Sequence, residues 1–147
     1  MDFNTGGSTG SINIGSANTI FVADLSQEVI NNNLFFTTKW SSRNLQFAYI
    51  SVPVGSDTGL DMHQNSAQLF YIEQGSALVI MGTCQECLDF QSFANDGFGI
   101  FVPVGIWHNI VNLGQIDLKM FTLYAPAFHS FNAVYATKEE WFAHEEP

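Results

Sequence analysis

Residues 99–112, GIFVPVGIWHNIVN, indicate the fold of this chain most clearly. Within this stretch, Pro103-Val104-Gly105 is typical of a turn and separates two short apolar segments of the kind found in strands. In the second segment His108 shares a strand face with Ile106 and Ile110, so we expect its imidazole to point into an apolar interior. A titratable side chain in such an interior needs a partner, and a metal ion can supply one.

A second stretch, residues 59–70 (GLDMHQNSAQLF), directs further polar side chains toward the same interior. Asp61 and His63 are two residues apart and therefore lie on one face of a strand. Asn65-Ser66 favours a turn, after which Gln68 on the returning segment can face the same side. The two stretches together predict a polar cluster inside an apolar barrel.

Most of the chain after residue 33 has the pattern of short β-strands. Segments rich in Phe, Ile, Val and Tyr alternate with Gly, Pro, Asn and Asp. Many short strands separated by tight turns favour a β-sandwich or a closed barrel. We expect strands near residues 34–39, 44–52, 58–63, 68–73, 77–81, 88–93, 98–102, 106–112 and 117–124.

Helical signals are confined to the two ends of the chain. Residues 24–32 are compatible with a short helix, and Thr137-Lys138-Glu139-Glu140 is a capping-box pattern that opens a C-terminal helix. Residues 1–18 are mostly Gly, Ser, Asn and Thr, and we expect a flexible N-terminal segment there. Residues 19–147 are expected to form one all-β barrel domain with a short C-terminal helix.

The composition limits the classes of partner. Fourteen Asp and Glu residues face four Lys and Arg, for a net charge of −10. This charge repels phosphate, so we expect neither nucleic acid nor an anionic membrane as a partner. Only 12% of residues are charged and 14% are aromatic, which suggests that a second copy covers some apolar surface, and we expect a homodimer. With no signal peptide or long apolar run evident, the expected location is cytoplasmic.

The two stretches resemble the two motifs of the cupin superfamily. The first has a glycine, a His-x-His-like pair, a Glu-like position and a glycine, and the second has Gly, Pro-x-Gly, His and Asn. Residues 118–129 and 137–140 also resemble the tail of small single-domain cupins described as mannose-6-phosphate isomerase-like. The resemblance covers residues 34–143. It implies a jelly-roll β-barrel.

The resemblance also implies a metal site. Cupins bind a divalent ion with two His and one Glu from the first motif and one His from the second. By position, these ligands are Asp61, His63, Gln68 and His108 in this chain. Asp61 replaces the usual first His and Gln68 replaces the usual Glu, so the one carboxylate has changed position. The implied cofactor is one divalent ion (Zn, Fe, Mn or Ni); the alternative is that both histidines are ordinary hydrogen-bonded residues of the interior.

Four further residues are candidates for the site. His129 lies where the resembling cupins tend to have a His, and it is our candidate for catalytic proton transfer; a solvent-facing loop position is the alternative. Phe70, Phe101 and Tyr124 are expected to line the pocket, with plain core packing as the alternative.

The cysteines form a lone CxxC pattern, Cys84-Gln85-Glu86-Cys87. A thioredoxin-like site needs a βαβ context, which this region lacks. A structural zinc site needs four ligands and could be completed only in a dimer. We therefore expect two incidental thiols in an exposed loop.

Fold alone does not give function, so three hypotheses remain open. The first is a metal-dependent enzyme, isomerase- or dioxygenase-like, acting on a small polar substrate such as a sugar or an organic acid. The second is a non-catalytic module that binds or senses a small molecule such as a carbohydrate; Asp61 and Gln68 favour it because they weaken the usual ligand set. The third is a structural jelly-roll protein.

Overall fold

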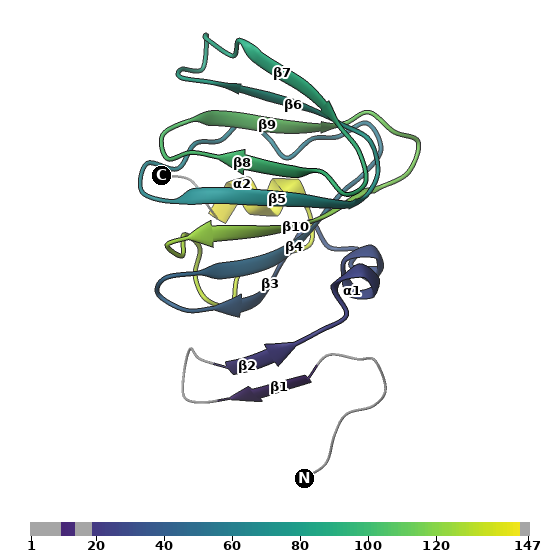
Figure 1. Ribbon diagram of the computed structural model, residues 1–147, viewed down its shortest axis with the longest axis vertical. Helices are drawn as coiled ribbons and strands as arrows, with labels where there is room; N and C mark the ends of the chain where they lie inside the picture. The colour runs from purple at the N-terminus through teal and green to yellow at the C-terminus, as the bar shows by residue number, and fades with distance from the viewer. Residues whose placement is uncertain (1–9, 14–18, 145–147) are drawn as a thin grey trace.

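The strands of the barrel form two antiparallel sheets that share one apolar core, and Figure 1 shows the smaller sheet above the larger one. The computed structural model describes residues 10–13 and 19–144. The larger sheet has the strand order β11-β3-β4-β10-β5-β8, and the smaller one has the order β7-β6-β9. The barrel strands are β3 (Phe36–Ser41), β4 (Gln46–Val52), β5 (Ala67–Gln74), β6 (Ala77–Gly82), β7 (Phe90–Ala94), β8 (Gly99–Val102), β9 (Trp107–Asn112), β10 (Leu118–Ala125) and β11 (Val134–Tyr135).

Alternation along each strand builds the core. In β10, Met120, Thr122 and Tyr124 are fully or almost fully buried and face the interior, while Phe121 and Leu123 lie on the outer face. On the neighbouring strands, too, every second side chain points inward, and these side chains complete the core.

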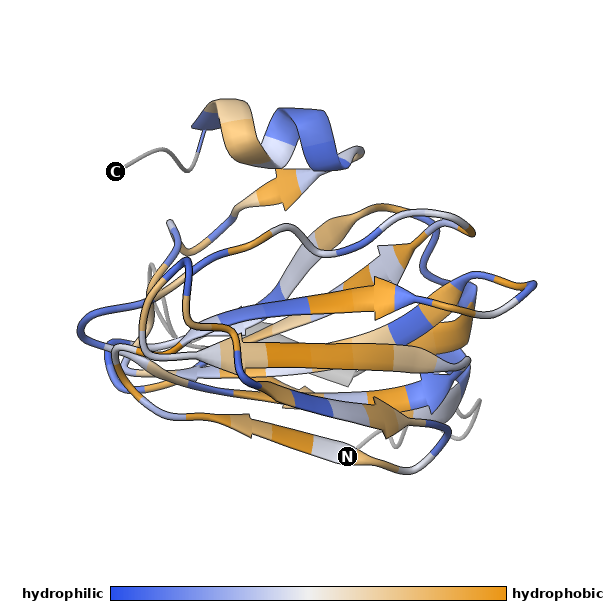
Figure 2. Cartoon of the chain, turned by 90° about the horizontal axis from the view of Figure 1, so that it is seen from above, coloured by the Kyte–Doolittle hydropathy of each residue, from blue (hydrophilic) through white to orange (hydrophobic). Residues whose placement is uncertain are grey.

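Two short helices flank the barrel. Helix α1 (Leu25–Asn31) begins at Asp24, whose carboxylate accepts a hydrogen bond from the Gln27 N–H at 3.3 Å. It packs Val29 against the outer face of the larger sheet, where the Tyr49 hydroxyl donates to Glu28 Oε1 at 2.9 Å. Helix α2 (Lys138–His144) lies outside the barrel strands (Figure 2).

The all-β jelly-roll fold and the C-terminal helix are confirmed. Eight of the expected strand segments coincide with strands, but the one at residues 58–63 does not. That segment contributes only the isolated bridge of Asp61 to His108, and Asp57 just before it bridges to Val111, because Gly59 has φ +87° and breaks the extended run.

The N-terminal region holds a hairpin. Strand β1 (Gly10–Asn13) pairs antiparallel with β2 (Thr19–Val22) as a separate two-stranded sheet. Residues 1–9 and 14–18 of the segment expected to be flexible lie outside the described residues, so that expectation stays a prediction. No helix in the described part of the chain is long and apolar enough to cross a bilayer.

Candidate functional site

A small cavity lies inside the barrel. A water-sized sphere can occupy ≈ 20 Å³ of it. A single water needs about 10–15 Å³ on this measure, so the cavity has room for an ion or a water but for no organic molecule. It is lined by Phe35, Phe36, Ile50, Thr58, Gly59, Asp61, His63, Gln68, Phe70, His108, Tyr124 and Trp141.

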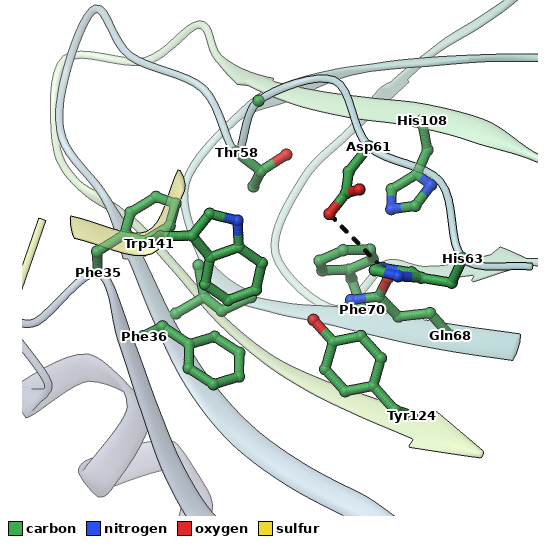
Figure 3. A pocket seen from close by; sticks show the side chains of 12 residues that line it. Phe35, Phe36, Thr58, Asp61, His63, Gln68, Phe70, His108, Tyr124 and Trp141 are labelled. Atoms are coloured by element: carbon green, nitrogen blue, oxygen red, sulfur yellow. Dashed lines mark ion pairs between the residues drawn. The ribbon is translucent and has the colours of Figure 1, made fainter. Parts of the chain in front are cut away.

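The cavity has a polar end and an aromatic end (Figure 3). The four residues expected to be metal ligands, Asp61, His63, Gln68 and His108, gather at the polar end. Trp141, Phe35 and Phe36 form the other end. The structure therefore brings together the predicted set from two distant stretches of sequence.

Backbone pairing holds these stretches side by side. The Asp61 N–H donates to the His108 carbonyl at 3.0 Å, and the His108 N–H donates to the Asp61 carbonyl at 2.9 Å. The Gly105 N–H donates to the His63 carbonyl at 2.8 Å. The side chains of Asp61 and His63 also approach, with 3.8 Å between Oδ2 and Nε2. The spacing of the polar groups is thus set by the main chain.

The hydrogen bond made by His108 determines its tautomer. Its Nδ1 lies 3.0 Å from the Ile106 carbonyl, which can only accept, so Nδ1 carries the proton and Nε2 keeps a lone pair. Burial lowers the pKa of His108 below its usual 6.5, although the Ile106 carbonyl and the Asp61 charge oppose the shift. His108 is therefore a neutral imidazole at pH 7, and its second nitrogen is oriented as metal-binding histidines usually are.

Gln68 presents an acceptor to the cavity. The Thr122 hydroxyl donates its one proton to the Leu69 carbonyl at 2.9 Å, so it must accept from Gln68 Nε2, also at 2.9 Å. The amide oxygen of Gln68 is thereby turned to the opposite side. This oxygen is buried and has no hydrogen-bond partner within the described residues. A buried acceptor without a partner costs about 1–3 kcal/mol, which a cation or a water in the cavity would offset.

The imidazole, carboxylate and amide groups at the polar end are of the types that bind a divalent cation, but they do not surround one common point. Among residues 10–13 and 19–144, no group of three His, Cys, Asp or Glu side chains is arranged to hold a metal ion. Two ligand atoms that each lie about 2.0–2.2 Å from one zinc ion in tetrahedral geometry are about 3.4 Å apart, close to the 3.8 Å between Asp61 Oδ2 and His63 Nε2. Further ligands would have to come from His108 and the Gln68 oxygen.

Two of the three predicted pocket residues line the cavity. Tyr124 packs edge-on against His63 with 5.4 Å between ring centroids, and the Phe70 ring lies 6.0 Å from that of His108. Phe101 does not line this cavity: its side chain is 74% exposed. The reason is strand alternation, because Ile100 and Val102 point inward from β8 and Phe101 points to the other face.

His129 lies behind the cavity wall. It is buried, which excludes the solvent-facing alternative, but it is not among the lining residues. Its ring packs against Phe36, Tyr124 and Trp141 with centroid distances of 4.8, 4.9 and 4.5 Å. An acid–base role for His129 stays a prediction.

The sequence reading missed the aromatic end of the cavity. Trp141 comes from α2, and Phe35 and Phe36 come from the start of β3. The one usable signal was the aromatic pair Trp141-Phe142 in the expected C-terminal helix, which is otherwise largely polar. The structure also corrects the expectation of incidental thiols, because Cys84 and Cys87 form a disulfide.

Comparison with known proteins places the chain in a family. No protein-family model matches it. It is 38% identical over 126 residues to the uncharacterized protein YrkC of Bacillus subtilis, a match covering 86% of this chain and 68% of YrkC. The crystal structure of BH2720 from Bacillus halodurans is 36% identical, has a TM-score of 0.82, and is matched over 84% of this chain and 93% of BH2720.

More distant structures identify the fold. The cupin domain of Cnp3 from Schizosaccharomyces pombe has a TM-score of 0.63 at 15% identity, over 81% of this chain and 83% of that domain. Other similar structures are also described as cupin or double-stranded β-helix proteins. The chain belongs to the same protein family as YrkC and BH2720, and its fold is that of the cupin superfamily.

Proposed function

We propose that this protein binds one divalent metal ion at the polar end of its barrel cavity, through His63, His108, Asp61 and the Gln68 amide oxygen. The observation that carries the proposal is the buried amide oxygen of Gln68. Because the Gln68 amide nitrogen donates to Thr122, the oxygen points away from Thr122, and it has no hydrogen-bond partner among the described residues. The lone pair of neutral His108 at the same end supports it. Two imidazoles with one carboxylate suit Zn, Fe, Mn or Ni.

The bound ion would present Lewis-acid character and open coordination positions to a small molecule. Binding of an oxygen-bearing small ligand is the function that this geometry supports best. An isomerase- or dioxygenase-like reaction at the ion is the second candidate, favoured by the titratable side chains of Asp61 and Tyr124 in the lining. The mannose-6-phosphate isomerase-like assignment belongs to this second candidate.

Metal content tests the proposal. Protein purified without chelator, and protein dialysed against Zn²⁺ and then against metal-free buffer, should each contain close to one equivalent of divalent metal by elemental analysis. A metal-free result in both samples would refute the site. Turnover assays on the loaded protein with sugars and organic acids then separate binding from catalysis.

We further propose that two copies pair through the outer face of the larger sheet. The strand register places one row of apolar side chains across five neighbouring strands. Phe21 of β2 and the α1 side chains pack over the part of the row around Phe47, which is buried, whereas Phe101 at the other end of the row is 74% exposed. The row carries no charge, whereas the chain as a whole carries −10, so two copies can meet at its exposed end without facing like charges. The row consists of Trp40, Phe47, Leu123, Leu69 and Phe101.

A charge placed on this row should separate the copies. Phe101→Glu is expected to convert a dimer to a monomer in light scattering coupled to size exclusion, because two buried carboxylates would face the interface. Phe93→Glu is the matched control, since Phe93 is 70% exposed on β7 of the other sheet. A parent protein that is monomeric at every concentration, or a Phe101→Glu protein that stays dimeric, would contradict the proposal.

A further inference from the structure

The aromatic end of the cavity is closed by α2, whose Trp141 belongs to the main apolar core. Trp141 of α2 is only 6% exposed, and its indole packs against Phe36 at 4.6 Å and Phe35 at 5.7 Å between ring centroids. In Figure 3 the indole stands in the cavity opposite the four polar residues. The side chain of a terminal helix is thus part of the wall of the candidate site.

His144 of α2 stacks on Tyr135 with 5.7 Å between ring centroids, and two other side chains of α2 reach the segment before Asp61. Lys138 forms an ion pair with Asp57. Phe142 lies over Gly59, where a Cβ would overlap its ring. A seven-residue helix has little stability of its own, so these contacts and the indole keep α2 docked. Release of α2 would uncover this segment, which its backbone hydrogen bonds to β9 still hold in place.

The cavity beside the polar cluster is small. The ≈ 20 Å³ beside the polar cluster admits an ion or a water. Sites for organic ligands are commonly about 300–1,000 Å³. Among the lining side chains, Trp141 is the one carried by a terminal helix outside the barrel strands, so its displacement is the way to enlarge the cavity without breaking the barrel.

The walls left by a displaced indole define the ligand chemistry. They are the rings of Phe35, Phe36, Phe70 and Tyr124, which suit a flat aromatic group. Besides the Tyr124 hydroxyl, the remaining polar group of the lining is that of Thr58, which is already hydrogen-bonded to Asn109 and to the Ile110 N–H. A sugar would bury several hydroxyls against these rings without partners, which is costly.

We propose that the Trp141 indole occupies the binding position of a small aromatic acid, and that the ligand displaces α2 to enter. The ring of the ligand would take the place of the indole, and its acidic oxygen would face the polar end. The binding of the acidic oxygen at the polar end rests on the metal site proposed above. The aromatic position itself is independent of the metal.

The movement of Trp141 can be followed in a protein in which it is the only tryptophan. Trp40→Phe/Trp107→Phe provides this, since neither replaced residue lines the cavity. Benzoate added to the Zn²⁺-loaded protein should shift the Trp141 emission to longer wavelength and increase its quenching by acrylamide several-fold. Glucose at the same concentration should do neither. Benzoate binding with unchanged Trp141 emission and quenching, displacement by glucose alone, or no benzoate binding to zinc-loaded protein would each overturn the proposal.

If Trp141 and the ligand occupy the same position, a variant in which α2 docks more weakly should bind the ligand more tightly. Lys138→Met weakens the closed form, so the apparent Kd for benzoate should fall about two- to fivefold, the range expected for a partly exposed ion pair. Glu139→Gln, at an exposed position next along α2, is the matched control and should leave the Kd unchanged. An equal Kd in all three proteins would show that α2 does not move.

A metal-free arm separates this proposal from the metal site. Trp141→Ala protein treated with a chelator should bind indole in calorimetry, because the ring fills the space left by the missing side chain. Elemental analysis of the zinc-loaded sample reports the metal site independently. Indole binding with no zinc retained would refute the metal site and support the aromatic position, whereas zinc retention with no indole binding would do the reverse.

Discussion

The His108→Ala protein is expected to bind Zn²⁺ about a hundredfold or more weakly than the parent. Loss of a residue that only orients a metal ligand typically costs ten- to a hundredfold in affinity, and His108 would itself be a ligand. Its Nδ1 is already committed to the Ile106 carbonyl, so the neutral ring offers Nε2 to the ion without first losing a proton. Competition with a chromophoric chelator at pH 7 measures the change.

Two further variants make this result specific. His144→Ala removes a histidine that is exposed on α2 and should leave zinc affinity unchanged. Gln68→Leu keeps the bulk of the side chain but removes the buried acceptor, and should weaken zinc about tenfold. If His108→Ala remains folded by circular dichroism and binds zinc as the parent does, His108 is not a ligand.

The Gln46→Leu protein is expected to lose about 2–4 kcal/mol of unfolding free energy. Gln46 is fully buried, and its Oε1 accepts the N–H groups of His129 at 2.8 Å and Phe128 at 3.2 Å. Its Nε2 donates to the carbonyls of His129 and Ser130 at 3.1 and 3.2 Å. Leucine would leave these backbone groups buried and unpaired, at about 1–3 kcal/mol for each group that water cannot reach.

Urea denaturation followed by far-ultraviolet circular dichroism measures this loss. Gln91→Leu is the control, because Gln91 is exposed on β7, and it should change stability by less than about 0.5 kcal/mol. The Gln46 variant should also weaken zinc binding, since the Phe128 ring packs on His63 at 4.2 Å between centroids. A stability equal to that of the control would show that water replaces the amide.

The interior pattern of this protein could be read from local sequence. His108 between Ile106 and Ile110, and Gln68 before Phe70, follow strand alternation, which depends only on the pleat of the backbone. The same rule places Phe101 on the outer face, between Ile100 and Val102. The expectation that Phe101 lines the cavity rested on its aromatic side chain and did not take this alternation into account. Asp61 and His63 reached the interior without a regular strand, because Gly59 interrupts it and bridges to β9 restore the pairing.

The barrel, its C-terminal helix and the four polar residues that meet inside it could be predicted from the sequence, because they depend on local periodicity, turn residues and motif spacing. Three features appear only in the folded chain: α2 folds back so that Trp141 closes the cavity, His129 lies behind Phe36 and Tyr124, and the Gln68 oxygen faces inward. Those features are contacts between segments far apart in the chain, such as Gln68 with Thr122 and Lys138 with Asp57, and no local pattern specifies which of them form.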